Sequence, residues 1–305
     1  MEIYLPIAEL SVNWAMILGM GAAIGFLSGM FGVGGGFLMT PLLIFYGIPS
    51  GIAVATQASP IAAASLAGAL GQSTRQGVDY KMGFVLLTGG LTGSFIGVYV
   101  FGILQELGQI DFVVDVSYVL LLGSIGGLML NESVRTIRAA RRGERVGGRK
   151  PGQHSWIHGL PFRVRFRRSG VYISVIPPAV LGLLVGIMTA ILGIGGAFLL
   201  IPAKIYLLRM PTKIAVGTSQ FQVFFVAATT TLLHAAIDHT VDIMLALLLI
   251  LGGVVGAQFG IRIGARLPGE QLRALLALLI VAMALRLFVG LVVTPSDIYS
   301  VVTST

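Results

Sequence analysis

Cysteine is absent from this chain, and charged residues are scarce. Without cysteine there can be no disulfide, thiolate metal site or cysteine nucleophile. Asp, Glu, Lys and Arg together make up only 10% of the 305 residues, whereas a soluble domain carries about a quarter. With 56% hydrophobic residues and a mean hydropathy of +0.94, the composition predicts a polytopic membrane protein.

Several functional classes lack their sequence signatures. The start of the sequence has neither a basic segment nor an A-x-A-like cleavage site, so no cleaved signal peptide is expected. There is no ATPase-type phosphate-binding loop, no His/Asp/Glu cluster for a transition metal, and no nucleophile, base and orienting acid together at membrane depth. All twelve acids fall in loops or near span ends, with Glu132 closest to an interior, so no buried carboxylate relay is expected. We therefore predict that the chain is not an enzyme and uses no cofactor, metal or ATP.

Positive charge is concentrated in one loop. Residues 135–168 hold eleven lysines and arginines against one acid, Glu144. A basic loop between apolar segments is typical of the cytoplasmic side of a membrane, and it also offers a contact for anionic lipid. Nucleic-acid binding is not expected, although the pI is near 10.1.

Two glycine-rich stretches interrupt the apolar pattern and copy each other. Phe31-Gly32-Val33-Gly34-Gly35-Gly36-Phe37 is matched in the second half by Leu192-Gly193-Ile194-Gly195-Gly196-Ala197-Phe198. Each is followed by an apolar segment of only twelve residues, 36–47 and 197–208, whose helical length is about 18 Å. This length is too short to cross a bilayer. Each half is therefore predicted to start with a re-entrant hairpin, down to the break and back on a half-helix. If both arms of each hairpin crossed the membrane fully, its two ends would still lie on the same side, so the predicted topology would not change.

The remaining apolar segments are long enough to span, or nearly so. They fall at about 14–30, 52–72, 83–104, 117–134, 173–191, 215–236, 243–263 and 272–293. With the N-terminus outside, 18 of the 20 lysines and arginines fall in inside segments, and the other two, Lys204 and Arg286, lie within apolar segments. The positive-inside rule thus predicts an N-out, C-out topology.

The internal repeat extends beyond the glycine stretches. Ala53-Val54-Ala55-Thr56 matches Ala215-Val216-Gly217-Thr218, and glycines at 89, 90, 93 and 97 match those at 252, 253, 256 and 260. The glycine ladders have the small-xxx-small spacing of close helix contacts. An odd number of full crossings in each half would invert the second copy. We thus predict an all-α fold of two inverted repeats, residues 1–134 and 171–305, joined by a basic cytoplasmic loop at 135–170. Such repeats with broken helices are typical of secondary transporters, whose site lies near the midplane.

The predicted site lies at the glycine breaks, because a half-helix N-terminus inside the membrane attracts an anion and glycine lets a ligand approach the backbone. The alternative is that the glycines serve only helix contacts. Polar residues on the next segment of each half are predicted at similar depth, where the alternative is plain interhelical hydrogen bonding. The candidate substrate-binding residues are Gly34, Gly35, Gly36, Phe37, Thr56, Gln57, Ser59, Gly195, Gly196, Ala197, Thr218, Ser219, Gln220, Gln222 and Lys204.

Three further side chains leave a choice open. Lys204 either attracts the anion or extends to the cytoplasmic interface. Arg286 is expected to reach the outer interface. His234 is a weak candidate for proton handling and is expected to be a hydrogen-bonded structural histidine.

At these residues the chain resembles the TauE/SafE sulfite exporter family, also called the toluene-sulfonate uptake permeases. The resemblance rests on Gly32-Val33-Gly34-Gly35-Gly36 with Pro41, on Ala53–Ser59, and on the second copy through Pro202 and Thr218. It implies movement of sulfite, sulfonates or related organosulfur anions across the cytoplasmic membrane. In the second copy Ala197 replaces the third glycine, so the two half-helices need not touch substrate equally.

Export is the direction we expect, since a negative cell interior favours loss of a monoanion by about 2.3 kcal/mol per 100 mV. The alternatives are Na⁺- or H⁺-coupled uptake of a sulfonate or another small anion, an anion channel, and, more remotely, a metal permease or an intramembrane hydrolase.

Overall fold

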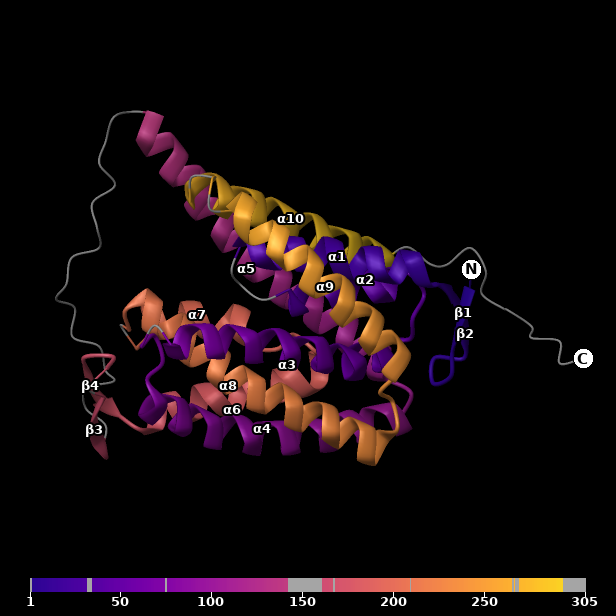
Figure 1. Cartoon of the computed structure of the whole chain (residues 1–305), viewed down its shortest axis with the longest axis horizontal. Coiled ribbons are helices and arrows are strands. Elements are labelled where there is room, and N and C mark those ends of the chain that lie inside the picture. The colour runs from indigo at the N-terminus through magenta and orange to yellow at the C-terminus, as the bar shows by residue number, and fades with distance from the viewer. Residues whose placement is uncertain are drawn as a thin grey trace, which may run out of the picture.

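The computed structural model describes residues 2–31, 35–74, 76–141, 161–166, 168–208, 210–264, 266 and 269–292. Within these ranges the chain is mostly helical, with two short β-hairpins (Figure 1). Gly34 and residues 142–160 of the basic loop lie outside the described residues.

In the described part of the first half there are one hairpin and five helices. They are β1 (Glu2–Leu5), β2 (Leu10–Asn13), α1 (Trp14–Phe31), α2 (Gly36–Phe45), α3 (Ser50–Thr74), α4 (Tyr80–Glu106) and α5 (Ile110–Arg141). The second half has the same order, with one π-helical turn added. Its elements are β3 (Arg163–Phe166), β4 (Val171–Ser174), α6 (Ile176–Leu192), α7 (Ala197–Tyr206), α8 (Thr212–Leu233), the turn η2 (His234–Asp238), α9 (Ile243–Gly264) and α10 (Gly269–Val292).

Among the described residues, six helical stretches are long and apolar enough to cross a membrane. They are Ser50–Thr74, Tyr80–Glu106, Ile110–Asn131, Thr212–Asp238, Ile243–Ile263 and Ala274–Val292. Helices α2 and α7 have ten residues each, about 15 Å of helix, which confirms that the segment after each glycine stretch is too short to span. The chain is therefore a multi-pass membrane protein built from α-helices.

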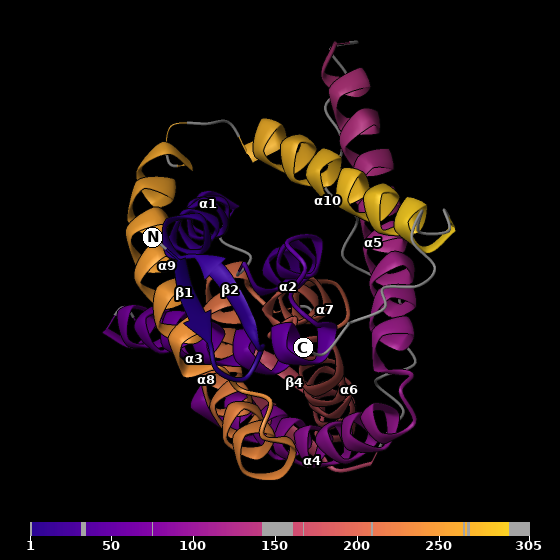
Figure 2. The same ribbon diagram turned by 90° about the vertical axis from the view of Figure 1, so that its right-hand side faces the viewer.

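The most extensive helix contacts join the two halves. α1 lies along α9 and α6 lies along α4, while α3 contacts α8 and α5 contacts α10. Viewed along the bundle, α2 and α7 lie in its interior, with α1, α9, α10, α5 and α4 around them (Figure 2). The elements that carry the predicted site thus occupy the centre of the molecule.

The glycine ladders explain the two closest helix pairs. A Cβ on Gly21 of α1 would lie 2.9 Å from the Leu249 carbonyl oxygen of α9, and one on Gly256 of α9 would overlap the carbonyl of Ala22. On the α4–α6 pair, a Cβ on Gly93 or Gly182 would likewise collide with the partner's backbone. The prediction of close helix packing at these glycines is confirmed. Any side chain there would force the helices apart.

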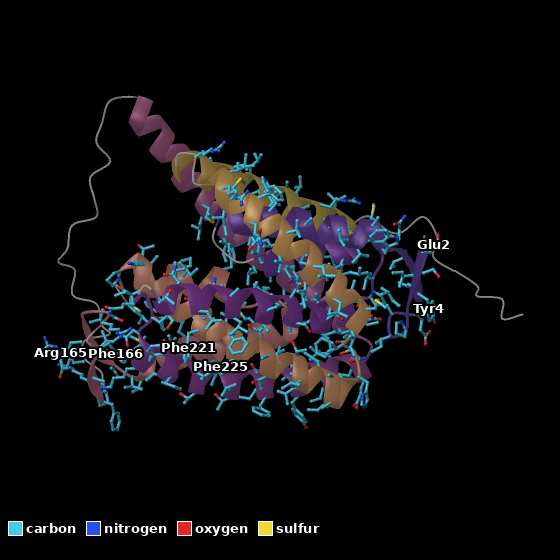
Figure 3. All side chains as sticks on the ribbon, in the orientation of Figure 1. Glu2, Tyr4, Arg165, Phe166, Phe221 and Phe225 are labelled. Atoms are coloured by element: carbon cyan, nitrogen blue, oxygen red, sulfur yellow. The ribbon has the colours of Figure 1, made fainter. Side chains whose placement is uncertain are left out.

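The two hairpins lie at opposite ends of the bundle. Figure 3 shows Glu2 and Tyr4 of β1 at one end, and Arg165 and Phe166 of β3 at the other. Both hairpins are antiparallel, and each directly precedes the first helix of its half. Residues 163–170, which the sequence assigned to the basic loop, thus include a strand, and α5 continues into that loop as far as Arg141.

Candidate functional site: the meeting point of two broken helices

The second glycine break is a left-handed backbone turn. α6 ends at Leu192 and α7 begins at Ala197, with Gly193, Gly195 and Gly196 between them at φ of +66°, +72° and +68°. Residues with a Cβ rarely adopt this conformation, so the glycines are needed here for backbone geometry alone. In the first break Gly35 is the N-cap of α2 and has an ordinary φ of −75°.

The two breaks touch each other. A methyl group added at Gly36 would lie 2.7 Å from the carbonyl oxygen of Ile194, in the other break. The side chain of Ile61, halfway along α3, fills the space between Gly36 and Gly195. The two half-helices therefore start at the same place in the bundle.

The first-turn aromatic rings of the half-helices stack. Phe37 of α2 and Phe198 of α7 have ring centroids 4.3 Å apart and planes inclined by 18°, and both side chains are buried. Sequence reasoning chose Phe37 but missed Phe198, although each of them directly follows the last small residue of its glycine stretch. This stack holds the N-terminal ends of α2 and α7 in contact.

Some buried polar atoms on α2, α3 and α8 have no hydrogen-bond partner within the described residues. They include Thr40 Oγ1, Gln57 Oε1 and both amide atoms of Gln222, whose Nε2 faces Gly90 of α4. Thr40 faces the second break, since a Cβ at Gly193 would lie 3.1 Å from its hydroxyl oxygen. Such atoms cost folding free energy, about 1–3 kcal/mol each, unless water or a ligand satisfies them.

Lys204 is buried in α7 and does not extend to the interface. Its side chain is 0% exposed, and its Nζ donates a hydrogen bond to Ser219 Oγ on α8 at 3.0 Å. Leu43 occupies the equivalent position of the first half, since it follows Pro41 as Lys204 follows Pro202. A buried ammonium with a hydroxyl as its partner is costly, which is typical of functional sites. Ser219, itself 0% exposed, is thereby joined to Lys204.

The other polar candidates lie elsewhere. Thr56 Oγ1 accepts the backbone N–H of Asp242, and Thr218 Oγ1 accepts that of Asp79, each at 3.0 Å. Gln220 packs against Gly68 of α3 rather than toward the breaks, and Ser59 is half-buried. Ala197 is buried as the first residue of α7.

Each of these two threonine contacts is part of what we call a crossed anchor. In a crossed anchor, a buried aspartate at the start of a helix in one half binds a hairpin and a threonine of the other half. Asp79 caps α4 by accepting from Met82 N, and its second carboxylate oxygen accepts from Ser169 in the tip of hairpin β3–β4. Asp242 accepts from Leu245 N of α9 and from Ile7 N in the tip of hairpin β1–β2. Each hairpin thus closes onto a helix of the other half.

The buried state of these acids refines one expectation. Asp79 and Asp242 do lie at span ends, but they are only 3% and 0% exposed. Asp238, at the end of η2, is also nearly buried and contacts His234. The sequence placed these acids correctly at span ends but did not reveal that they are buried. Residue type and distance from the end of a span do not reveal that a hairpin from the other half covers that end.

Comparison with known proteins identifies a family for this chain. Residues 17–287 match the model of the family described as Sulfite exporter TauE/SafE. The chain belongs to the TauE/SafE family. A probable membrane transporter protein of Xylella fastidiosa is 29% identical over 272 residues, 88% of this chain and 92% of its own length. A second one, YunE of Bacillus subtilis, is 26% identical over 285 residues, 90% and 97% of the two chains. No solved structure matches the chain significantly.

As a TauE/SafE member the chain is a membrane transporter and not an enzyme. Its match covers both glycine breaks and the helices around them.

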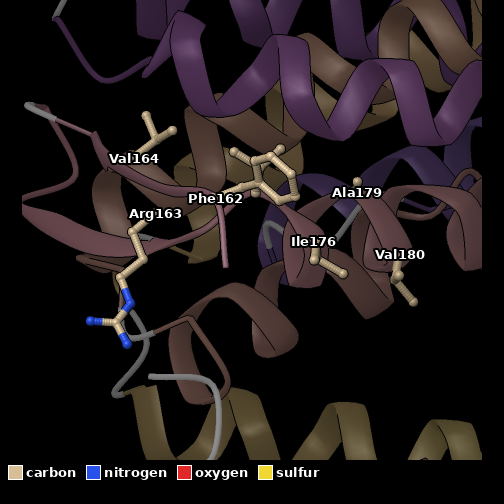
Figure 4. A pocket seen from close by; sticks show the side chains of 7 residues that line it. Phe162, Arg163, Val164, Ile176, Ala179 and Val180 are labelled. Carbon is tan, nitrogen blue, oxygen red and sulfur yellow. The ribbon is translucent and has the colours of Figure 1, made fainter. Parts of the chain in front are cut away.

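A separate crevice of about 530 Å³ lies away from the breaks, between hairpin β3–β4 and the start of α6 (Figure 4). Its lining is mostly apolar and consists of Phe162, Arg163, Val164, Val175, Ile176, Ala179 and Val180.

The two remaining side chains have definite partners. His234 is 0% exposed and hydrogen-bonded through both ring nitrogens, as expected for a structural histidine. Arg286 is exposed, and its guanidinium lies 5.3 Å from the ring centre of Phe45.

Proposed function

We propose that this transporter moves sulfite, organosulfonates or related organosulfur anions out of the cell across the cytoplasmic membrane. The anion is held near the midplane, where the N-termini of α2 and α7 meet. The observation that carries the proposal is the stacking of Phe37 on Phe198, which brings two half-helix N-termini together.

Electrostatics favours an anion at this point. Each helix N-terminus carries about half a positive elementary charge and N–H groups without intrahelical acceptors. Two such ends in contact repel each other in a medium of low dielectric constant, and an anion between them reverses the sign of that interaction. Lys204 on α7 adds a buried amine, which is a further hydrogen-bond donor on the half-helix.

An inverted repeat would give this site two routes of access. The crossed helix pairs α1–α9 and α4–α6, the two hairpins at opposite ends, and the two crossed aspartate anchors are the relations expected of a two-fold axis in the membrane plane. With the N-terminus outside, β1–β2 covers the outer end and β3–β4 the cytoplasmic end. The anchor at Asp79 and the anchor at Asp242 would then open in turn.

The substrate class comes from the family description, and the direction from the membrane potential. An exporter of a monoanion gains about 2.3 kcal/mol per 100 mV from a negative interior. The basic loop at 135–168 fits this orientation as a cytoplasmic segment that contacts anionic lipid.

Binding is tested first by thermal unfolding of the purified protein in detergent with sulfite, taurine, thiosulfate or a simple carboxylate. A ligand at 100 times its Kd stabilises by about 2.7 kcal/mol. Stabilisation by sulfur anions and not by the carboxylate supports the proposal, and equal responses to all of them contradict the substrate class.

The site itself is tested by Gly36→Ala, which places a methyl group at the meeting point of the breaks. Gly19→Ala on α1 is the matched control, since nothing lies within 4 Å of its added Cβ. Anion counterflow in proteoliposomes should be lost in Gly36→Ala and kept in Gly19→Ala. Wild-type counterflow in a folded Gly36→Ala protein would contradict the site. Transport that needs an imposed Na⁺ or proton gradient would favour coupled uptake, and flux without counterflow would favour a channel.

A further inference from the structure

The π-helical turn η2 follows α8 of the second half. At this turn the second half contains one residue more than the first half has after the corresponding helix, α3. Thr56 aligns with Thr218, and at the same spacing Asp79 would align with Val241, yet its structural counterpart is Asp242. The π-helical turn His234–Asp238 lies between these points, and a π-bulge is how a helix absorbs one inserted residue. The backbone has the same left-handed kink afterwards in both halves, at Gln76 (φ 53°) and His239 (φ 52°). π-Bulges of this kind occur frequently at functional sites.

The bulge places one buried imidazole between two hydrogen-bond acceptors. Nδ1 of His234 lies 2.7 Å from Asp238 Oδ2, and Nε2 lies 3.0 Å from the backbone carbonyl oxygen of Ala190 on α6. From α4, the ring of Phe101 packs edge-on against the imidazole, and Gly102 lies beside Asp238. Among the described residues in contact with the imidazole, Asp238 is thus the charged group.

Counting hydrogens defines the state of this pair. A backbone carbonyl can only accept, so Nε2 must carry a hydrogen. The contact between Nδ1 and the carboxylate needs a second hydrogen, either on the ring or on Asp238. Both contacts can be hydrogen bonds at the same time only when the pair holds one proton more than a neutral histidine and an ionised aspartate. Removing it sets two lone pairs against each other in one of the two contacts.

The contact that depends on this proton connects α8 to the end of α6. Ala190 precedes the left-handed turn at Gly193 by three residues, and that turn starts the second half-helix. We propose that His234 and Asp238 form a proton-binding site whose occupied state locks η2 to α6, and that loss of the proton releases this lock during transport. The inference rests on the proposed function and adds a proton to it as a linked ligand.

Asp238→Asn removes proton binding by the pair and keeps the hydrogen bonds of the imidazole. The asparagine amide can donate to Nδ1 while Nε2–H still donates to Ala190, so both contacts persist with no exchangeable excess proton. This variant imitates the protonated pair at every pH. His234→Gln replaces the imidazole by an amide that does not titrate, and so removes the site. His239→Gln is the matched control, because a glutamine already occupies the same backbone conformation at position 76.

The site is tested directly by ¹⁵N NMR of histidine-labelled protein in detergent, with His234→Gln to assign the signal. The His234 pair should lose one proton in a single step between mildly acidic and alkaline buffer, and this step should vanish in Asp238→Asn. An unchanged His234 signal across the range overturns the proposal, whether or not sulfur anions are transported.

Counterflow then tests the link to transport. In wild type and His239→Gln, the rate should rise with pH by up to about tenfold per pH unit, as release of one proton requires. In Asp238→Asn the rate should be low at every pH, and in His234→Gln it should be independent of pH. A wild-type pH profile in Asp238→Asn overturns the link. Absence of counterflow in the wild type would refute the proposed function, while the NMR step would still report on the proton site.

Discussion

Replacing Lys204 tests whether a buried amine that lowers the stability of the fold is needed for anion binding. Its side chain is 0% exposed, and its hydrogen-bond partner in the described residues is Ser219 Oγ, at 3.0 Å. Lys204→Met keeps an unbranched side chain of similar length and removes the amine. If the lysine serves only packing, methionine should be a near-neutral replacement.

The free-energy terms favour the methionine variant. Removing the amine loses one charge-assisted hydrogen bond, about 1.5–3 kcal/mol. It also removes the desolvation penalty of a buried charge, which is several kcal/mol even after relaxation. The freed Ser219 hydroxyl can bond to a carbonyl of its own helix. The expected net effect is a stabilisation of about 1–3 kcal/mol, in the range seen when buried ionic groups are replaced by apolar ones.

Two measurements decide the matter. Unfolding in detergent should show a higher midpoint for Lys204→Met than for wild type, and added sulfite should no longer raise that midpoint. Ser219→Ala is the complementary variant, because it leaves the amine without its partner and should destabilise by about 1–3 kcal/mol. A Lys204→Met protein that is less stable than wild type but keeps its response to sulfite would refute this reasoning.

Three other substitutions test the packing around the site, each by its unfolding midpoint in detergent. Asp242→Ala removes the N-cap of α9 and leaves the Ile7 N–H without an acceptor, so we expect a loss of about 2–4 kcal/mol, with wild-type stability as the contrary result. Gly256→Val places a side chain against the Ala22 backbone of α1 and should prevent stable assembly of that helix pair, whereas Val at an open helix glycine should not. Tyr118→Phe deletes a 2.6 Å hydrogen bond to the last carbonyl of α6 and should cost about 1 kcal/mol, and no change would mean that this bond does not hold the break.

The sequence by itself determined the helices and their breaks. Segments expected at 14–30, 36–47 and 243–263 appear as helices 14–31, 36–45 and 243–264. Hydrophobic run length and glycine position are local properties, and in a membrane they suffice because each helix satisfies its own backbone hydrogen bonds. The glycine ladders were read correctly for the same reason, since only close backbone contact explains them.

Irregular and polar features were harder to read. The hairpin Arg163–Ser174 begins inside the basic loop, and its alternating Arg-Val-Arg-Phe is too short to distinguish from a charged linker. Thr56 and Thr218 have the residue type and depth of a substrate site, yet their hydroxyls hold the starts of α9 and α4. A hydroxyl can serve a ligand or a neighbouring backbone equally well, so its partner is not a property of its own helix.

Tertiary structure alone decided which residues meet. The stacking of Phe37 on Phe198, the wedge of Ile61 between the breaks, and the crossed anchors at Asp79 and Asp242 all join segments that are far apart in the chain. Burial of Lys204 is decided in the same way, because α8 covers it. Local pattern determines where a helix forms and how deep it reaches, whereas the contacts that build a site depend on how helices from both halves pack against each other.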